Sequence, residues 1–153
     1  MKTQAAPIFH GVEALVSAMS RVTAERPQAR VVLAIGCFDP FQVGHVRYLE
    51  AAATHGDFLV AAVFDDARTR ELEGPGRPVV PAEDRARVLA GARAIDAVVV
   101  TGAGDGNPIL ESLKPACLVR DSLFTADTIP ERETCRRLGI DVAIARDGGD
   151  GGR

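Results

Sequence analysis

The chain alternates between short apolar runs and longer segments in which apolar residues recur every three or four positions. Runs of this kind, uninterrupted by polar residues, are typical of strands buried on both faces of a parallel sheet. Such strands are expected over residues 30–36, 58–64, 96–100, 116–119 and 140–144. The fold class that follows is α/β.

Helical spacing fills the intervals between these strands. The first helix is predicted over 11–25, and the second starts near Val46 and ends before Gly56. Residues 73–81 are rich in Gly and Pro and predict a loop, after which Pro81 opens a further helix. Two short helices are expected near 108–114 and 130–138.

This order predicts a Rossmann-like three-layer sandwich with a five-stranded parallel sheet. Residues 1–145 are expected to form one domain with a leading N-terminal helix, and 146–153 are expected to form a flexible Gly/Asp tail. If the chain reverses across the sheet after the third strand, strands 30–36 and 116–119 become neighbours. The crevice at their carboxyl ends is then the expected ligand site.

Composition narrows the class of protein. The chain has 153 residues, 46% of them hydrophobic, which suits a single packed core. A formal net charge of -3 argues against binding to nucleic acid, and no apolar run approaches the roughly 20 residues that span a membrane. Its three cysteines form no C-x-x-C pair, which is consistent with reduced thiols and a cytoplasmic location.

The candidate chemistry lies in residues 36–45, which read G-C-F-D-P-F-Q-V-G-H. A Gly-containing turn between a parallel strand and a helix presents backbone N–H groups and the positive end of the helix dipole to an anion. His45, at the start of that helix, can donate to the same anion. With the end of strand 116–119, the predicted nucleotide-binding residues are Gly36, Cys37, Phe38, Asp39, Gly44, His45, Arg120 and Asp121.

This run resembles the G-x-F-D-x-x-H-x-G-H signature of the cytidylyltransferase-like nucleotidyltransferases. Across residues 12–145 the chain is similar to the adenylyltransferases that activate D-glycero-β-D-manno-heptose 1-phosphate. The matching segments, in order, are Val46-Arg47-Tyr48-Leu49, Asp65-Asp66, and Arg77-Pro78-Val79 followed by Pro81, Glu83 and Arg85. Several matched segments are more specific than one short motif.

The resemblance implies transfer of a nucleotide, AMP from ATP or the corresponding group from CTP, to a small phosphorylated substrate, with Mg²⁺ and release of pyrophosphate. It implies catalytic roles for His45, Gln42 and Arg120. Substrate contacts fall to Asp65, Arg77 and Arg85. Asp39 is either a plain helix or turn cap or, as the resemblance implies, a shape-setting and metal-proximal residue. A homodimer is also expected.

The departures from the family pattern gather at the phosphates. Gln42 stands where the first His is expected, Glu73 replaces a Lys, and Arg120-Asp121-Ser122-Leu123 replaces K-G-G-D. A closing Ser/Thr-rich turn is not found before the tail. We expect Glu73 to point away from the phosphates or to pair with Arg70 or Arg77.

Two alternatives therefore stay open. One is a catalytically weak relative that binds nucleotide or a small phosphorylated ligand, with or without a partner protein. The other is a flavodoxin-like or other α/β binding domain that mimics only the first motif. In that case the match of the Arg77-Pro78-Val79 segment would have to be a coincidence.

Overall fold

A computed structural model describes residues 4–102 and 105–145 of the chain. Its centre is a six-stranded sheet in the order β1-β4-β3-β2-β5-β6, with all neighbours parallel. The strands are β1 (Ile8–His10), β2 (Val31–Gly36), β3 (Phe58–Phe64), β4 (Ala97–Thr101), β5 (Cys117–Arg120) and β6 (Asp141–Ile144). The α/β class and the five predicted strands are confirmed.

The predicted strand count was wrong by one, because β1 adds to the edge of the sheet. It pairs with β4 in the register Ile8↔Val98 and is only 3 residues long. A run this short carries no measurable period of two, so its sequence does not separate an edge strand from an extended loop. The predicted tail, residues 146–153, lies outside the described residues.

Six helices connect or precede the strands within the described part of the chain. They are α1 (Val12–Glu25), α2 (Val43–Ala53), α3 (Asp66–Glu73), α4 (Ala82–Ala90), α5 (Asn107–Leu113) and α6 (Arg132–Leu138). All but α3 were predicted. In α3 the single buried residue is Thr69, so the helix has no apolar stripe for periodicity to reveal.

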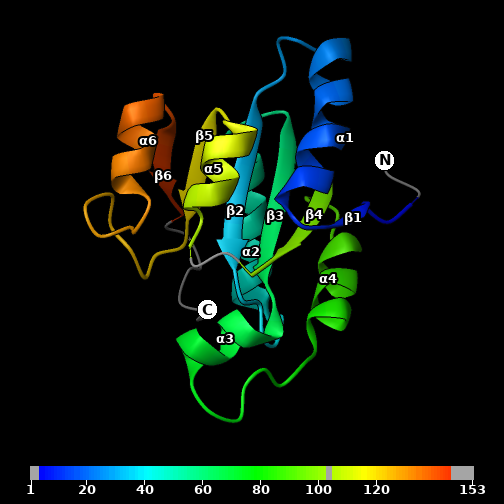
Figure 1. The fold of residues 1–153 in the computed structure, drawn as a ribbon, viewed down its shortest axis with the longest axis vertical. Helices are drawn as coiled ribbons and strands as arrows, with labels where there is room; N and C mark the ends of the chain where they lie inside the picture. Colours follow the sequence, from blue (N-terminus) through cyan, green and yellow to red (C-terminus); the bar gives the residue numbers. More distant parts are fainter. Residues whose placement is uncertain (1–3, 103–104, 146–153) are drawn as a thin grey trace.

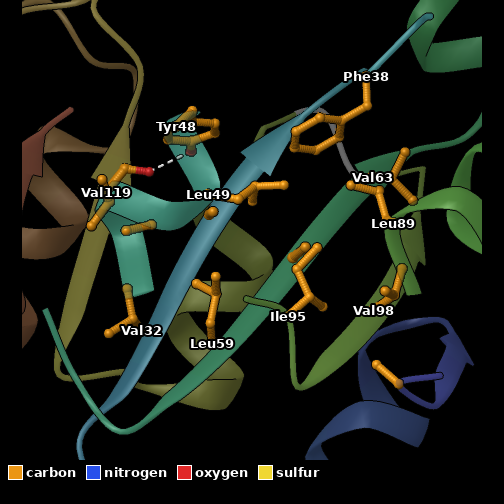
Figure 2. Close-up of a cluster of buried hydrophobic side chains, with 14 of the residues drawn as sticks. Val32, Phe38, Tyr48, Leu49, Leu59, Val63, Leu89, Ile95, Val98 and Val119 are labelled. Carbon is orange, nitrogen blue, oxygen red and sulfur yellow. Dashed lines mark hydrogen bonds between the residues drawn. The ribbon is translucent and has the colours of Figure 1, made fainter. Parts of the chain in front are cut away.

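Alternate residues of each strand enter two separate cores, which produces the three layers. Val32 and Ala34 pack with α2 and α4 on one face, whereas Leu33 and Ile35 pack with α1 and α5 on the other. This follows from the period of two in a strand. Figure 2 shows the first of these cores, which includes Leu49 of α2 and Leu89 of α4.

The predicted reversal of the chain across the sheet is present. Strands β2 and β5 are direct neighbours, in a register that runs from Val32↔Cys117 to Ala34↔Val119. Helix α3 lies beyond the carboxyl ends of the strands (Figure 1). Among the described residues, none of the helices is long and apolar enough to span a membrane.

Candidate functional site

A cavity of about 310 Å³ opens at the carboxyl ends of β2 and β5, where the sequence placed the ligand crevice. One part of it is formed by Gly36, Cys37, Phe38 and His45, and Arg120 and Asp121 face them from the end of β5. We call the side formed by Phe64, Arg68, Leu72 and Glu73 the α3 wall, and the side formed by Arg120, Asp121, Leu123, Phe124 and Glu131 the β5 wall.

His45 is held in one orientation at the start of α2. Its Nδ1 accepts the backbone N–H of Gln42 at 3.0 Å, and its ring packs edge-on against Phe38 at 5.2 Å between centroids. Since Nδ1 is an acceptor, the proton of the neutral ring resides on Nε2. His45 is 2% exposed and lines the cavity, so its ring lies in a largely dehydrated site.

The turn before α2 is shaped by two residues of the motif. Phe38 is buried and adopts a φ of +52°, a left-handed conformation that is uncommon outside glycine. A side chain at Gly36 would approach the Phe38 ring at 3.2 Å, so glycine allows the ring to pack there. Gly44 is buried in the first turn of α2.

Gln42 occupies the N-cap position of α2, where its side chain is exposed. The residues that line the cavity do not include it. Its contribution to the neighbourhood of the cavity is the backbone N–H that orients His45. The catalytic role that the sequence predicted for the Gln42 side chain stays a prediction.

Arg120 crosses the end of β5 toward the cavity. Its guanidinium lies 4.4 Å from the centroid of the Phe124 ring, and its Nη1 lies 3.9 Å from Oε1 of Glu131. Its Nε and Nη1 are buried and have no hydrogen-bond partner within the described residues. Arg120 is therefore oriented by an aromatic ring and a carboxylate while retaining donors.

Asp39 anchors the loop that follows α3. Its carboxylate accepts the Nε–H of Arg77 at 2.9 Å and the backbone N–H groups of Val79 and Val80 at 2.7 and 2.8 Å. Burial acts to raise the pKa of Asp39, but these hydrogen bonds and the Arg77 charge outweigh it and lower the pKa. Both oxygens are thus engaged by protein donors.

The same engagement makes Asp39 a poor fit to a metal ligand. Among residues 4–102 and 105–145, no group of three or more His, Cys, Asp or Glu side chains is placed to hold a metal ion. The described residues therefore do not form a dedicated Mg²⁺ cage. The metal-proximal role predicted for Asp39 stays a prediction, whereas its role in shaping the turn is visible.

Arg85 and Arg77 serve the protein's own structure in this arrangement. Arg85 is 1% exposed and donates to the carbonyls of Val80, Cys37 and Phe64 and to the carboxylate of Asp66. Arg77 donates to Asp39. Neither arginine lines the cavity. The structure does not bring these two predicted substrate-binding residues to the site, and their ligand roles stay predictions.

Asp65 begins α3 as its N-cap, and its Oδ1 accepts the backbone N–H of Arg68 at 2.8 Å. It does not line the cavity. Glu73 does line the cavity, and its Oε1 lies 3.7 Å from Nη1 of Arg77. The expected pairing of Glu73 with Arg77 is confirmed, and Glu73 places the last turn of α3 at the cavity.

Sequence reasoning missed several residues of the two walls. Arg68 was missed because α3 itself was not predicted. Phe124 and Glu131 lie in the connection between β5 and α6, where the motif match had ended. Phe124 is non-polar and Glu131 is acidic, and both lie in an irregular segment. Only the fold places them beside Arg120. No local sequence signal identifies them.

Comparison with known proteins places this geometry in a family. Residues 33–145 match the cytidylyltransferase-like family. The chain is 42% identical over 115 residues to the bifunctional protein HldE of Alcanivorax borkumensis, covering 75% of this chain and 24% of that protein. It is 41% identical over 124 residues to HldE of Geobacter sulfurreducens, covering 80% and 25%. The chain thus spans about a quarter of the length of these relatives.

Two solved structures share the fold. A lipopolysaccharide core biosynthesis protein from Thermoplasma volcanium aligns with a TM-score of 0.64 at 24% identity, over 76% of this chain and 93% of that one. The pantoate-β-alanine ligase of Francisella tularensis, complexed with β-γ ATP and β-alanine, aligns with a TM-score of 0.65 at 10% identity, over 92% and 66%. These likenesses establish the fold alone. The sequence match, which extends over most of the chain and includes the cavity-forming turn, shows that this protein belongs to the cytidylyltransferase-like family.

Proposed function

We propose that this chain is a nucleotidyltransferase that moves AMP from ATP to a sugar phosphate such as D-glycero-β-D-manno-heptose 1-phosphate. An oxygen of the sugar phosphate attacks the α-phosphorus of ATP. A new P–O bond forms, the bond between the α-phosphorus and the bridging oxygen breaks, and pyrophosphate leaves. The products are an ADP-sugar and pyrophosphate.

One observation carries the proposal. The cavity brings a helix N-terminus, a buried His45 with its Nε2 proton and a half-satisfied Arg120 to the same crevice. Phosphoryl chemistry requires little covalent help from the protein and depends on positioning and on donors directed at developing charge. These are the groups that the crevice supplies.

The roles follow from charge and position. The first turn of α2 binds a phosphate through backbone N–H groups. His45 donates from Nε2 to an oxygen of the α-phosphate. Arg120, on the β5 wall, offsets negative charge of the phosphates. A divalent cation would enter on the triphosphate, because Mg²⁺ in such sites is bound largely by substrate phosphates.

The binding-only alternative has one observation in its favour. The arginines around the cavity each face a carboxylate of the protein itself, in the pairs Arg77–Glu73, Arg120–Glu131 and Arg68–Glu71. This leaves less net positive charge for a triphosphate than the arginines alone suggest. A relative that binds nucleotide and turns over slowly is consistent with these pairs.

The deciding experiment measures pyrophosphate release by the full chain with ATP or CTP and a panel of sugar 1-phosphates. Steady release with ATP and heptose 1-phosphate supports the proposal, and release with CTP alone would reassign the base. Calorimetric binding of ATP without release with any acceptor would favour the weak relative. A chain that neither binds ATP or CTP nor releases pyrophosphate would contradict both readings.

Gln42→His tests whether the amide at position 42 limits the rate of the chemical step. Placing the family's imidazole at position 42 should raise the rate of pyrophosphate release if the neutral amide limits that step. An equal or lower rate in the variant would mean that the site has adapted around Gln42. Binding of ATP, measured in parallel, shows whether the substitution has acted on affinity instead.

A further inference from the structure

The α3 wall contains a cation that no motif of the sequence identifies. Arg68 lies in the first turn of α3 and lines the cavity. Its guanidinium carbon lies 5.9 Å from the centroid of the Phe64 ring, and 25% of its side chain is exposed. This distance is within the range of a cation–π contact, which favours positions of the guanidinium over the face of the ring.

The donors of Arg68 are only partly used by the protein. One terminal amino group, Nη1, donates to Oε1 of Glu71 at 3.1 Å. The Glu71 side chain is 67% exposed, so this ion pair contributes little energy. The Nε of Arg68 is buried and has no hydrogen-bond partner within residues 4–102 and 105–145. Arg85, on the neighbouring α4, instead donates to four protein acceptors. Arg68 is thus the arginine of the α3 wall that remains available to a ligand.

The strand order and the geometry of in-line attack together assign a reactant to this wall. Under the proposed function, the triphosphate rests on the turn before α2 and on Arg120 of the β5 wall. In-line displacement requires the attacking oxygen to approach the α-phosphorus from the side opposite to the departing pyrophosphate. The α3 wall follows β3, the neighbour of β2 on the side away from β5, so under this placement of the triphosphate it faces the second reactant.

We propose that Arg68 binds the phosphate of the acceptor sugar phosphate and sets its position for attack. This inference rests on the proposed function. A sugar phosphate carries a charge of about -1.5 to -2 at neutral pH, by analogy with other phosphate monoesters. Glu73 on the same wall would repel that charge, and Arg68 offsets it from the same helix.

The test compares Arg68→Gln with Arg70→Gln in the full chain. Arg70 is an exposed arginine of the same helix that does not line the cavity, so it controls for helix composition and net charge. Arg68→Gln should raise the KM for heptose 1-phosphate by about 10-fold or more, the effect of one charge-assisted hydrogen bond. The KM for ATP should change by a smaller factor, no more than the roughly threefold that one charge unit on this wall contributes, and Arg68→Lys should restore part of the loss.

Binding is measured as well, so that the result does not depend on turnover. Heptose 1-phosphate is titrated calorimetrically into each variant in the presence of a non-hydrolysable ATP analogue. Weaker binding by Arg68→Gln, with Arg70→Gln unchanged, supports the inference. Equal affinity and KM in Arg68→Gln and the natural chain overturn it while the proposed function stands.

Failure of the proposed function gives a different result. A chain that binds the acceptor through Arg68 but releases no pyrophosphate retains the inference as a binding role and loses the transferase assignment. A natural chain that binds no heptose 1-phosphate in the titration overturns both the acceptor and the role of Arg68. Thermal unfolding of each variant shows whether the fold is intact.

Discussion

The hydroxyl of Tyr48 donates to the carbonyl of Val119 at 2.5 Å (Figure 2). The same hydroxyl accepts the backbone N–H of Ile35 at 3.1 Å. It therefore joins helix α2 to both central strands at the point where the β2–β5 register ends, directly beneath the cavity. One buried side chain thus links the three elements that meet at the site.

Tyr48→Phe tests what the shared hydroxyl contributes to stability. The variant keeps the ring but leaves a buried N–H and a buried C=O without their shared partner, which should cost about 1–3 kcal/mol of unfolding free energy. Urea denaturation measures the difference. A loss below about 0.5 kcal/mol, the range of an ordinary surface change, would mean that water replaces the hydroxyl.

The ionisation of Tyr48 gives a second test. Burial raises the pKa of Tyr48 above its usual value. A raised folded pKa contributes stability below the unfolded pKa, about 10, and that stability is lost as the pH rises toward the folded value. Tyr48 is the one tyrosine and the chain has no tryptophan, so phenolate absorbance reports this group alone.

We expect the absorbance change in alkaline titration to coincide with loss of the circular dichroism signal of the fold. The reason is that Tyr48 becomes accessible when the chain unfolds. A phenolate signal that rises near pH 10 in the folded chain, about the value for an exposed tyrosine, would contradict the buried position of the hydroxyl.

Asp39 predicts a component of acid sensitivity. Its lowered pKa means that ionised Asp39 stabilises the fold above the unfolded pKa of about 3.9, and that this stability disappears as the pH falls through the lower folded value.

Asp39→Asn should therefore cost about 2–4 kcal/mol of unfolding free energy near pH 7, because the amide cannot accept all three donors. The difference from the natural chain should shrink below about pH 4. An undiminished difference at pH 3 would mean that the cost comes from packing alone. Asp57→Asn is the control, because Asp57 is exposed and its carboxylate accepts one hydrogen bond, from the backbone N–H of Arg30 at 2.7 Å, which an amide oxygen can also accept.

The central strands were predictable because their sequence decides their environment. Val31 to Ile35 is continuously apolar, and all five residues are buried, which is what a central parallel strand requires. The neighbouring position of β2 and β5 followed from connection rules rather than from any residue. The location of the cavity then followed from the topology.

Residues that act through distant partners could not be assigned in this way. The residues around Arg85 in the sequence do not indicate whether its side chain contacts a ligand or lies buried. Only the fold shows that it donates to the carbonyls of Cys37 and Phe64, on two other segments. Asp39 shows the same limit, since its partners lie about forty positions away in the chain. Arg68 was hidden because α3 is charged and exposed, so no period marked the helix.

His45→Ala tests the donor at the centre of the site. Removing one preorganised donor to a developing anion should lower the rate of pyrophosphate release by about 100-fold or more. His55→Ala is the matched control, because His55 is exposed and does not line the cavity. Unchanged turnover in His45→Ala would remove His45 from the mechanism. The loss of its bond to Gln42 also affects α2, so thermal unfolding is compared for all three chains.

Glu73→Lys addresses the charge that most sets this chain apart from its family pattern. Glu73 lines the cavity and pairs with Arg77, so it both places negative charge at the rim and reduces the charge of an arginine. The substitution changes two charge units, each equivalent to about 0.7 kcal/mol against a unit negative charge at ~6 Å in water. ATP should therefore bind about tenfold more tightly at low salt, and the gain should diminish as salt screens the charges.

Glu73→Gln, which changes one charge unit, should show an intermediate effect on ATP affinity. Calorimetric titration of ATP at low and high ionic strength measures both variants. If neither binds ATP more tightly at low salt, Glu73 lies too far from the triphosphate for its charge to act on it, and the loss of the Arg77 pair is the only consequence of replacing Glu73.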